Sequence, residues 1–285
     1  MLENTYGPKF RELRKEQDVT LIKAAKGITS KSSLSLWEQG KDNLSFNQVL
    51  KLIKRIHIQP IEFFDYLVSP KLINMSIKID AAYVASDIAT LRKYVIEKAE
   101  LSQAHPQNQE YFIEYCFACT FYQDLSENKP FTENDQKRLT NILSNISEWN
   151  YKNIFYFCNT LGLLDAKTIH RLANSLINYS LNHELEHRRW YDEVLSAVLN
   201  SAAILIKRDY HLAESVLNNI EKLPLSDRSA FEKIHIKYDR ALIKYIKTKD
   251  DQDIKTIIYA TKLLNLSTIE DGCVTGFNQI KEIYG

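Results

Sequence analysis

Apolar side chains recur at helical spacing in short blocks over residues 7–67, and polar capping residues separate the blocks. Thr20 and Ser30 can cap two helices, Ser45-x-x-Gln48 is a capping box for a third, and Gly40 can end one. Five helices with a tight turn between the second and third form a helix-turn-helix plan. The expected helices open at Pro8, cover 21–26, 31–38 and 46–56, and open again at Pro60.

Beyond Ser69-Pro70 the same helical periodicity continues to Gly285, which predicts about ten further helices, or five pairs. Trp149 and Asn159 recur as Trp190 and Asn200, 41 residues later. A period near 40 residues is typical of a solenoid in which each helix pair buries its apolar face by stacking on its neighbours. The sequence therefore predicts an all-α chain with a helix-turn-helix domain at 1–67 and a helical-repeat domain at 68–285.

Composition agrees with helices and not with a β-sandwich, because seven Gly and six Pro are too few for its turns. The net charge of +1 hides an asymmetry: residues 1–66 carry +3 and the remainder −2. Charges interrupt every apolar run before it reaches the about 20 residues of a membrane span, and the first residues lack signal-peptide character. We expect a cytoplasmic protein without a membrane anchor.

Few residue clusters indicate catalysis or metal binding. No phosphate-binding, zinc-protease or nucleophile-elbow motif is present, so we expect no enzymatic activity and no cofactor. Cys116-x-x-Cys119 lies in an apolar helical run and is interpreted as two buried thiols, with a redox or zinc pair as the alternative. His183 and His187 have the spacing of a helical metal pair but no identifiable third ligand, and a solvated polar stretch is the preferred interpretation.

Residues 30–40, Ser-Lys-Ser-Ser-Leu-Ser-Leu-Trp-Glu-Gln-Gly, resemble the recognition helix of Xre/Cro-type repressors. Together with Leu44-Ser45 and 56–58 they are more similar to the Rgg/GadR/MutR family of regulators. The resemblance implies that the third helix enters the DNA major groove. We interpret Leu34, Trp37, Leu44 and Ile53 as core, and Glu38 as a tie to a neighbouring helix.

Two kinds of side chain are expected to contact DNA. Cations neutralise phosphates, and short side chains at the start of the third helix read bases. Relatives often carry Gln where Ser33 lies and Arg where Leu36 lies, so this chain is expected to favour A/T-rich sites by DNA shape. The candidate DNA-binding residues are Arg11, Arg14, Ser30, Lys31, Ser32, Ser33, Leu36 and Lys41, with Lys51, Lys54 and Arg55 as further phosphate candidates.

The repeated asparagines indicate a peptide site. Trp and Asn ten residues apart on one helix point about 80° apart. The Trp can then pack between layers while the Asn amide faces a groove and bonds a peptide backbone. A solvated asparagine is the alternative. The candidate peptide-binding residues are Asn159, Asn200, Tyr156, Arg188, Lys237 and Tyr238.

Residues 148–151, Glu-Trp-Asn-Tyr, with Asn159 and Asn200, also resemble the Rgg family. The resemblance implies a right-handed, tetratricopeptide-like domain that binds short secreted peptide pheromones, and homodimers whose C-terminal helices pair. The sequence thus predicts a DNA-binding transcription regulator in quorum sensing. Two alternatives stay open: a ligand-independent regulator whose repeat domain is a dimerisation scaffold, and a protein-interaction adaptor with a degenerate helix-turn-helix.

Overall fold

The computed structural model describes residues 6–65, 71–183 and 188–285, and within these ranges it contains helices and no β-strand. The predicted all-α fold class is thus confirmed. The chain divides into two compact units, Met1–Lys78 and Ile79–Gly285, each with its own core. The boundary expected between residues 67 and 68 falls within 66–70, outside the described residues, and stays a prediction.

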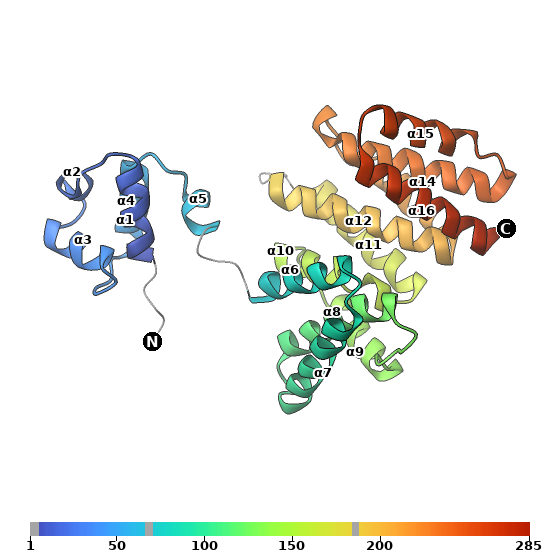
Figure 1. Cartoon of the computed structure of the whole chain (residues 1–285), viewed down its shortest axis with the longest axis horizontal. Helices are drawn as coiled ribbons and strands as arrows, with labels where there is room; N and C mark the ends of the chain where they lie inside the picture. Colours follow the sequence, from blue (N-terminus) through green and yellow to red (C-terminus); the bar gives the residue numbers. More distant parts are fainter. Residues whose placement is uncertain (1–5, 66–70, 184–187) are drawn as a thin grey trace. The chain divides into compact units, whose positions relative to one another are not determined.

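The first unit contains the five helices of a helix-turn-helix domain (Figure 1). The hydroxyls of Thr20, Ser30 and Ser45 accept hydrogen bonds from backbone N–H groups of the following helices, as predicted. Gln48 completes the capping box with Ser45. These bonds satisfy donors that a helix start otherwise leaves unpaired, so the helix starts are fixed locally. The helices are α1 (Tyr6–Glu16), α2 (Leu21–Ala25), α3 (Lys31–Glu38), α4 (Phe46–Arg55) and α5 (Pro60–Asp65).

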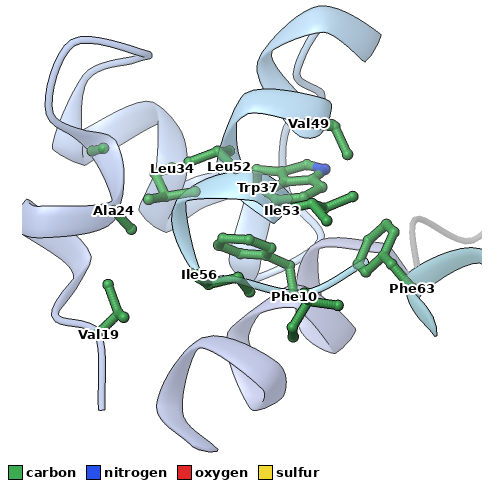
Figure 2. Close-up of a cluster of buried hydrophobic side chains, with 12 residues drawn as sticks. Phe10, Val19, Ala24, Leu34, Trp37, Val49, Leu52, Ile53, Ile56 and Phe63 are labelled. Atoms are coloured by element: carbon green, nitrogen blue, oxygen red, sulfur yellow. The ribbon is translucent and has the colours of Figure 1, made fainter. Parts of the chain in front are cut away.

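An apolar core joins these helices (Figure 2). Phe10 of α1 packs on Trp37 of α3, with ring centroids 5.3 Å apart. Leu34, Trp37 and Ile53 are buried as predicted, whereas Leu44 is half-buried at the edge of the cluster. Because α1, α3 and α4 all contribute to this cluster, the position of α3 is fixed by packing and its opposite face is left for other contacts.

The second unit consists of the remaining helices, which follow one another through short connections (Figure 1). Among the described helices, none combines the length and the apolar character that a bilayer span requires. The elements are α6 (Lys71–Val84, shared between the units), α7 (Ile88–Ala104), α8 (Gln109–Leu125), α9 (Glu133–Ser144), α10 (Tyr151–Cys158), η1 (Leu161–Leu163), α11 (Ala166–Asn182), α12 (Arg188–Arg208), α13 (Tyr210–Ile220), η2 (Asp227–Ser229), α14 (Ala230–Thr248), α15 (Gln252–Leu263) and α16 (Ser267–Tyr284).

From α9 onward the helices pack in two interleaved rows. In one row α9 packs on α11 and α11 on α13, and in the other α10, α12, α14 and α16 pack in succession. Figure 1 shows α12 beside α11 and α14. Helix α12 thus has neighbours in both rows, which explains why its predicted apolar stripe is buried: Val194, Leu195, Val198, Leu199 and Ala202.

The 41-residue period appears as a contact between equivalent residues. The indole Nε1 of Trp190 donates a hydrogen bond to the carbonyl of Trp149 at 2.7 Å. A bond between equivalent positions of successive pairs is what a stack of helical repeats predicts. The handedness of the stack stays a prediction. The leucines that share the period are buried: Leu164 with Leu205, and Leu176 with Leu217.

Candidate functional sites

Hydrogen bonds at both ends fix the length of α3. At its start, the Ser30 hydroxyl accepts from the Ser33 backbone N–H at 3.0 Å. At its end, Gly40 has a φ of 72°, and the N–H groups of Gly40 and Lys41 each donate to carbonyls of the last turn at 2.9 Å. This is a Schellman motif, whose positive φ glycine adopts without strain. The eight residues between these ends form a helix of defined length.

Three residues of α3 are exposed on its outer face. Lys31, Ser32 and Leu36 are exposed, Leu36 by 43% of its area. Ser33 is half-buried, and its hydroxyl accepts a hydrogen bond from the Ser30 hydroxyl at 2.9 Å. The hydroxyls of Ser30 and Ser33 therefore take part in the cap, and the exposed Ser32 hydroxyl also lies 2.9 Å from that of Ser30. Lys31 and Leu36 face outward.

Arg14 belongs to the core of the first unit and not to its surface. The side chain is buried, its Nε and Nη2 each donate to the Glu38 carboxylate at 2.7 Å, and its Nη1 donates to the Val19 carbonyl at 2.7 Å. A buried guanidinium held in this way cannot also reach a phosphate, so the DNA contact expected for Arg14 was wrong. The tie expected for Glu38 is confirmed, and Gly7 permits the close packing, because a Cβ there would lie 1.7 Å from the Trp37 carbonyl oxygen.

The other cations of the first unit are either anchored or exposed. The Nη1 of Arg55 donates to the carbonyls of Lys23 and Lys26 at 3.0 Å each, which closes the end of α2. Arg55 is thereby committed to a structural role. Arg11 and Lys41 are exposed and have side chains long enough to meet a phosphate oxygen.

Gln39, the C-cap residue of α3, is a surface residue that the sequence analysis did not single out. It is exposed at the end of the helix, and its amide nitrogen donates to the Ser35 hydroxyl at 3.1 Å. Gln39 follows Ser32 by seven residues and Leu36 by three, so the three side chains share one face. That spacing was available in the sequence, and an amide is the side chain that pairs with adenine through two hydrogen bonds.

The repeat places the two tryptophans in contact but does not give the two asparagines the same geometry. Trp190 and Asn200 both lie within α12, whereas Trp149 precedes α10 and Asn159 is its C-cap. The amide nitrogen of Asn159 donates back to a carbonyl of α10 at 2.8 Å. Asn200 is exposed, and its amide nitrogen lies 3.5 Å from the sulfur of Cys158. The amide of Asn200 is therefore the better placed of the two for an external ligand.

Two cavities adjoin the outer face of α12 and share Lys207. The α14–α16 cavity, of about 400 Å³, lies between α12, α14 and α16, and the η1 cavity, of about 440 Å³, lies between α8, η1 and α12. Ala203 lines the first cavity, Ile204 lines the second, and Lys207 lines both. Asn200 lines neither cavity but precedes Ala203 by three residues, so the four residues share one face of α12. We call this face and the two cavities the α12 trough.

The two cavities of the α12 trough differ in charge. Lys129, Lys207 and Arg208 line the η1 cavity and outnumber its one carboxylate, Asp124. The Arg208 guanidinium donates to the carbonyls of Gly162, at 2.9 Å, and Leu164. The α14–α16 cavity instead contains the buried carboxyl of Asp239, and burial raises the pKa of this carboxyl to about 8. The α12 trough thus has a cationic end and a buried acidic group at the other end.

The other predicted peptide contacts are not gathered in one place. Tyr156 is buried beside a separate polar cavity of about 800 Å³ between α9 and α10. Tyr238 is buried in the α14–α16 cavity, where its hydroxyl donates to the Cys273 carbonyl and holds α14 against α16. Lys237 is exposed on α14. Arg188 opens α12, and its side chain lies outside the described part of the structure.

The structure tests the prediction for the cysteine pair but only part of the prediction for the histidine pair. Cys116 and Cys119 are buried free thiols, as predicted, and burial raises the pKa of both. His183 is exposed and stacks on Tyr179 with ring centroids 3.8 Å apart, while His187 lies outside the described residues. Within the described ranges, no three His, Cys, Asp or Glu side chains are grouped to hold a metal ion.

Two solved structures share this fold along nearly the whole chain. The Streptococcus dysgalactiae SHP pheromone receptor Rgg2 is 18% identical with a TM-score of 0.76, and the match covers 96% of this chain and 99% of that one. PrgX in its complex with cCF10 is 16% identical with a TM-score of 0.73, over 97% of this chain and 92% of that one. At these identities the similarity establishes the arrangement of helices.

Sequence profiles of known families match both units. Residues 10–63 match a helix-turn-helix profile. Residues 95–274 match the C-terminal domain of the HTH-type transcriptional regulator Rgg, which is more than half of the chain. The resemblance drawn from residues 30–40 and 148–151 is thereby confirmed, and the chain belongs to the Rgg family of helix-turn-helix transcriptional regulators.

Proposed function

We propose that this chain regulates transcription as a cytoplasmic homodimer that binds double-stranded DNA through α3 and a short, apolar signalling peptide through the α12 trough. The observation that carries the DNA-binding half is the outer face of α3, where Ser32, Leu36 and Gln39 are exposed at the spacing of a major-groove reader. Arg11 and Lys41 supply exposed cations for the phosphates.

The side chains of α3 favour A/T-rich sites. The Gln39 amide matches the donor and acceptor edge of adenine, and Leu36 can touch a thymine methyl. The Ser32 hydroxyl can form a hydrogen bond with any of several bases. Helix α3 contains no arginine, the residue that most often reads guanine. Phosphate contacts therefore supply most of the affinity, and base discrimination is modest.

The α12 trough suits an extended peptide because it combines apolar side chains with an exposed amide. Ala203 and Ile204 offer apolar contact, and the Asn200 amide can both donate to and accept from a peptide backbone. Among the structures of similar fold, Rgg2 is named a pheromone receptor and PrgX is solved in a complex with cCF10. We extend peptide binding to this chain with their support.

A homodimer would cover an apolar surface on α15. Tyr259 and Leu263 lie one turn apart there and are 67% and 69% exposed. Large exposed apolar side chains that adjoin one another are typical of interaction surfaces. Pairing of the C-terminal helices of two copies would bury them and present two α3 helices to half-sites one or more helical turns apart. A peptide that binds two arrangements of such a dimer unequally shifts the balance between them.

Gel mobility shift with DNA from upstream of the gene tests the DNA-binding half. Because phosphate contacts dominate, we expect affinity to fall by at least about tenfold between about 50 mM and about 200 mM salt. Absence of binding even at the lower salt would favour the adaptor alternative.

Calorimetry with short apolar peptides encoded beside the gene tests the peptide half. We expect heat and thermal stabilisation with the chain's own peptide, and loss of both with Asn200→Asp, which replaces an amide donor by a carboxylate. DNA binding together with no response to any such peptide would favour the ligand-independent regulator with the repeat domain as a scaffold.

A further inference from the structure

The α14–α16 cavity holds a carboxyl group that packing alone does not explain. Asp239 is 4% exposed and projects from α14 among the side chains that line the cavity. Among the described residues its carboxylate forms no hydrogen bond and no ion pair, and burial is the cause of its raised pKa. A buried carboxylate without a partner is costly, since the charged form loses its hydration and gains nothing in return.

The polar side chains around Asp239 either form hydrogen bonds with other groups or lie at the mouth of the cavity. The Tyr238 hydroxyl donates to the Cys273 carbonyl of α16. Lys207 is exposed on α12 and forms no ion pair with Asp239, and Asp271 is exposed at the start of α16. The remaining walls are largely aliphatic. The aliphatic side chains are those of Ala203, Ile206, Leu242 and Ile280, and α16 adds Gly272, Cys273, Thr275, Gly276 and Gln279 to the lining.

His235 also lines this cavity and contains a buried polar atom. The Nε2 atom of His235 is buried and has no hydrogen-bond partner in the described structure. His235 precedes Asp239 by one helical turn, so both side chains are on one face of α14. Burial lowers the pKa of His235, which favours the neutral ring and leaves one ring nitrogen able to accept a hydrogen bond.

A carboxylate and an imidazole acceptor one turn apart, at the polar side of an aliphatic cavity, match a group that only donates hydrogen bonds and carries a positive charge. A primary ammonium has three donors and no acceptor. An ammonium would stabilise the ionised form of Asp239, which burial alone disfavours, whereas an anionic ligand would disfavour that form further. A purely apolar ligand would leave both polar groups unpaired.

We propose that the α14–α16 cavity binds a primary ammonium group on an apolar stem, with Asp239 and His235 as its hydrogen-bond acceptors. The identity of the natural ligand rests on the proposed function, in which the chain binds a signalling peptide. The ammonium is then the free amino terminus of the signalling peptide or a lysine side chain near its end, and the cavity fixes which end of the peptide lies between α14 and α16.

Calorimetry on the full-length protein with small probes tests the cavity without the peptide. The probes are n-hexylamine, which imitates a lysine side chain, leucyl-leucine amide, which presents an amino terminus, and its N-acetyl derivative. We expect one of the two amines to bind at least tenfold more tightly to the wild type than to Asp239→Asn, and the acetylated compound to lose binding. The tighter amine identifies the source of the ammonium.

Two controls keep the result specific. Asp271→Asn removes the same charge from the mouth of the cavity and is expected to change amine affinity less than twofold. Hexan-1-ol, which lacks the charge, is expected to bind the wild type and Asp239→Asn alike. Failure of both amines to bind, or equal binding to the wild type and Asp239→Asn, would overturn the proposal. Because no peptide or DNA is used, that failure would leave the proposed function to its own experiments.

Discussion

The guanidinium of Arg14 and the carboxylate of Glu38 form a buried, two-pronged ion pair that joins α1 to α3. Because a third bond runs from Arg14 to the Val19 carbonyl, the same side chain also holds the chain segment that leads into α2. The pair therefore fixes the position of α3 against the rest of the first unit. A substitution that breaks this pair is therefore expected both to lower the free energy of unfolding of the first unit and to shift the DNA-reading face of α3.

Arg14→Ala is expected to destabilise the first unit by about 3 to 5 kcal/mol, because it leaves the Glu38 carboxylate buried without a partner. The measurement is urea unfolding of the full-length protein followed by the fluorescence of Trp37, with the other two tryptophans replaced by phenylalanine. Arg11→Ala, which removes an exposed cation from the same helix, is the matched control and should leave unfolding unchanged while it weakens DNA binding. An unfolding midpoint of Arg14→Ala equal to that of the wild type would contradict the structural role of the pair.

The sequence contained enough to locate the helix starts of the first unit but not the role of Arg14. Side-chain caps such as Ser30 act within three residues, so their effect can be inferred from local sequence. Arg14 follows Phe10 by four residues and thus lies on the buried face of α1. That position was a signal, but its partner Glu38 is 24 residues away, and only the packing of α1 on α3 brings the two together.

The repeat shows a similar limit. The 41-residue spacing of Trp149 and Trp190 predicted stacked helix pairs, and the hydrogen bond between them agrees. The parallel expectation for Asn159 and Asn200 depended on helix boundaries. Helix α10 ends at Cys158, which turns the Asn159 amide back toward its own helix, whereas α12 continues past Asn200. The α14–α16 cavity could not be predicted from the sequence, because only the three-dimensional structure shows that the carboxylate of Asp239 is buried without a partner.

Gln39→Ala is expected to change site preference, whereas Lys41→Ala is expected to weaken binding to all sites alike. The first removes an amide that can pair with adenine, with a loss of about 1 to 3 kcal/mol at one base position. The second removes a phosphate contact and should lower the salt dependence of the binding constant by about one unit of slope. Selection from a randomised DNA pool, followed by titration at several salt concentrations, separates the two. Equal losses on every sequence for Gln39→Ala would refute its reading role.

Leu263→Glu is expected to dissociate the homodimer by placing a charge in the apolar surface of α15. The side chain is 69% exposed, so the substitution costs the monomer little. Sedimentation velocity should show the dimer for the wild type and a monomer for the variant at micromolar concentration. Lys262→Glu, a charge reversal at the neighbouring exposed position, serves as control and should keep the dimer. A dimeric Leu263→Glu protein would place the interface elsewhere.

Asp239→Asn is expected to raise the free energy of unfolding near neutral pH and to remove the pH dependence that Asp239 gives to this free energy. Burial raises the pKa of Asp239 from 3.8 to about 8, so the folded chain retains a proton that the unfolded chain releases. The free energy of unfolding therefore falls as the pH rises from about 4 to about 8, by about 1.4 kcal/mol for each unit of pKa shift.

The measurement is urea unfolding of the second unit at several pH values. Below about pH 4 Asp239 is protonated in both the folded and the unfolded chain, so the free energy of unfolding of the wild type and of Asp239→Asn should depend on pH in the same way there. Above that pH the difference between the two free energies should grow until about pH 8. Lys207, His235, Tyr238, Asp271 and Cys273 also line the cavity and are present in both proteins, so comparison of the two curves isolates Asp239. Asp271→Asn, at the exposed mouth, should follow the wild type. Parallel curves for the wild type and Asp239→Asn across the whole range would mean that the Asp239 carboxylate has a partner in solution, and the ammonium site would lose its basis.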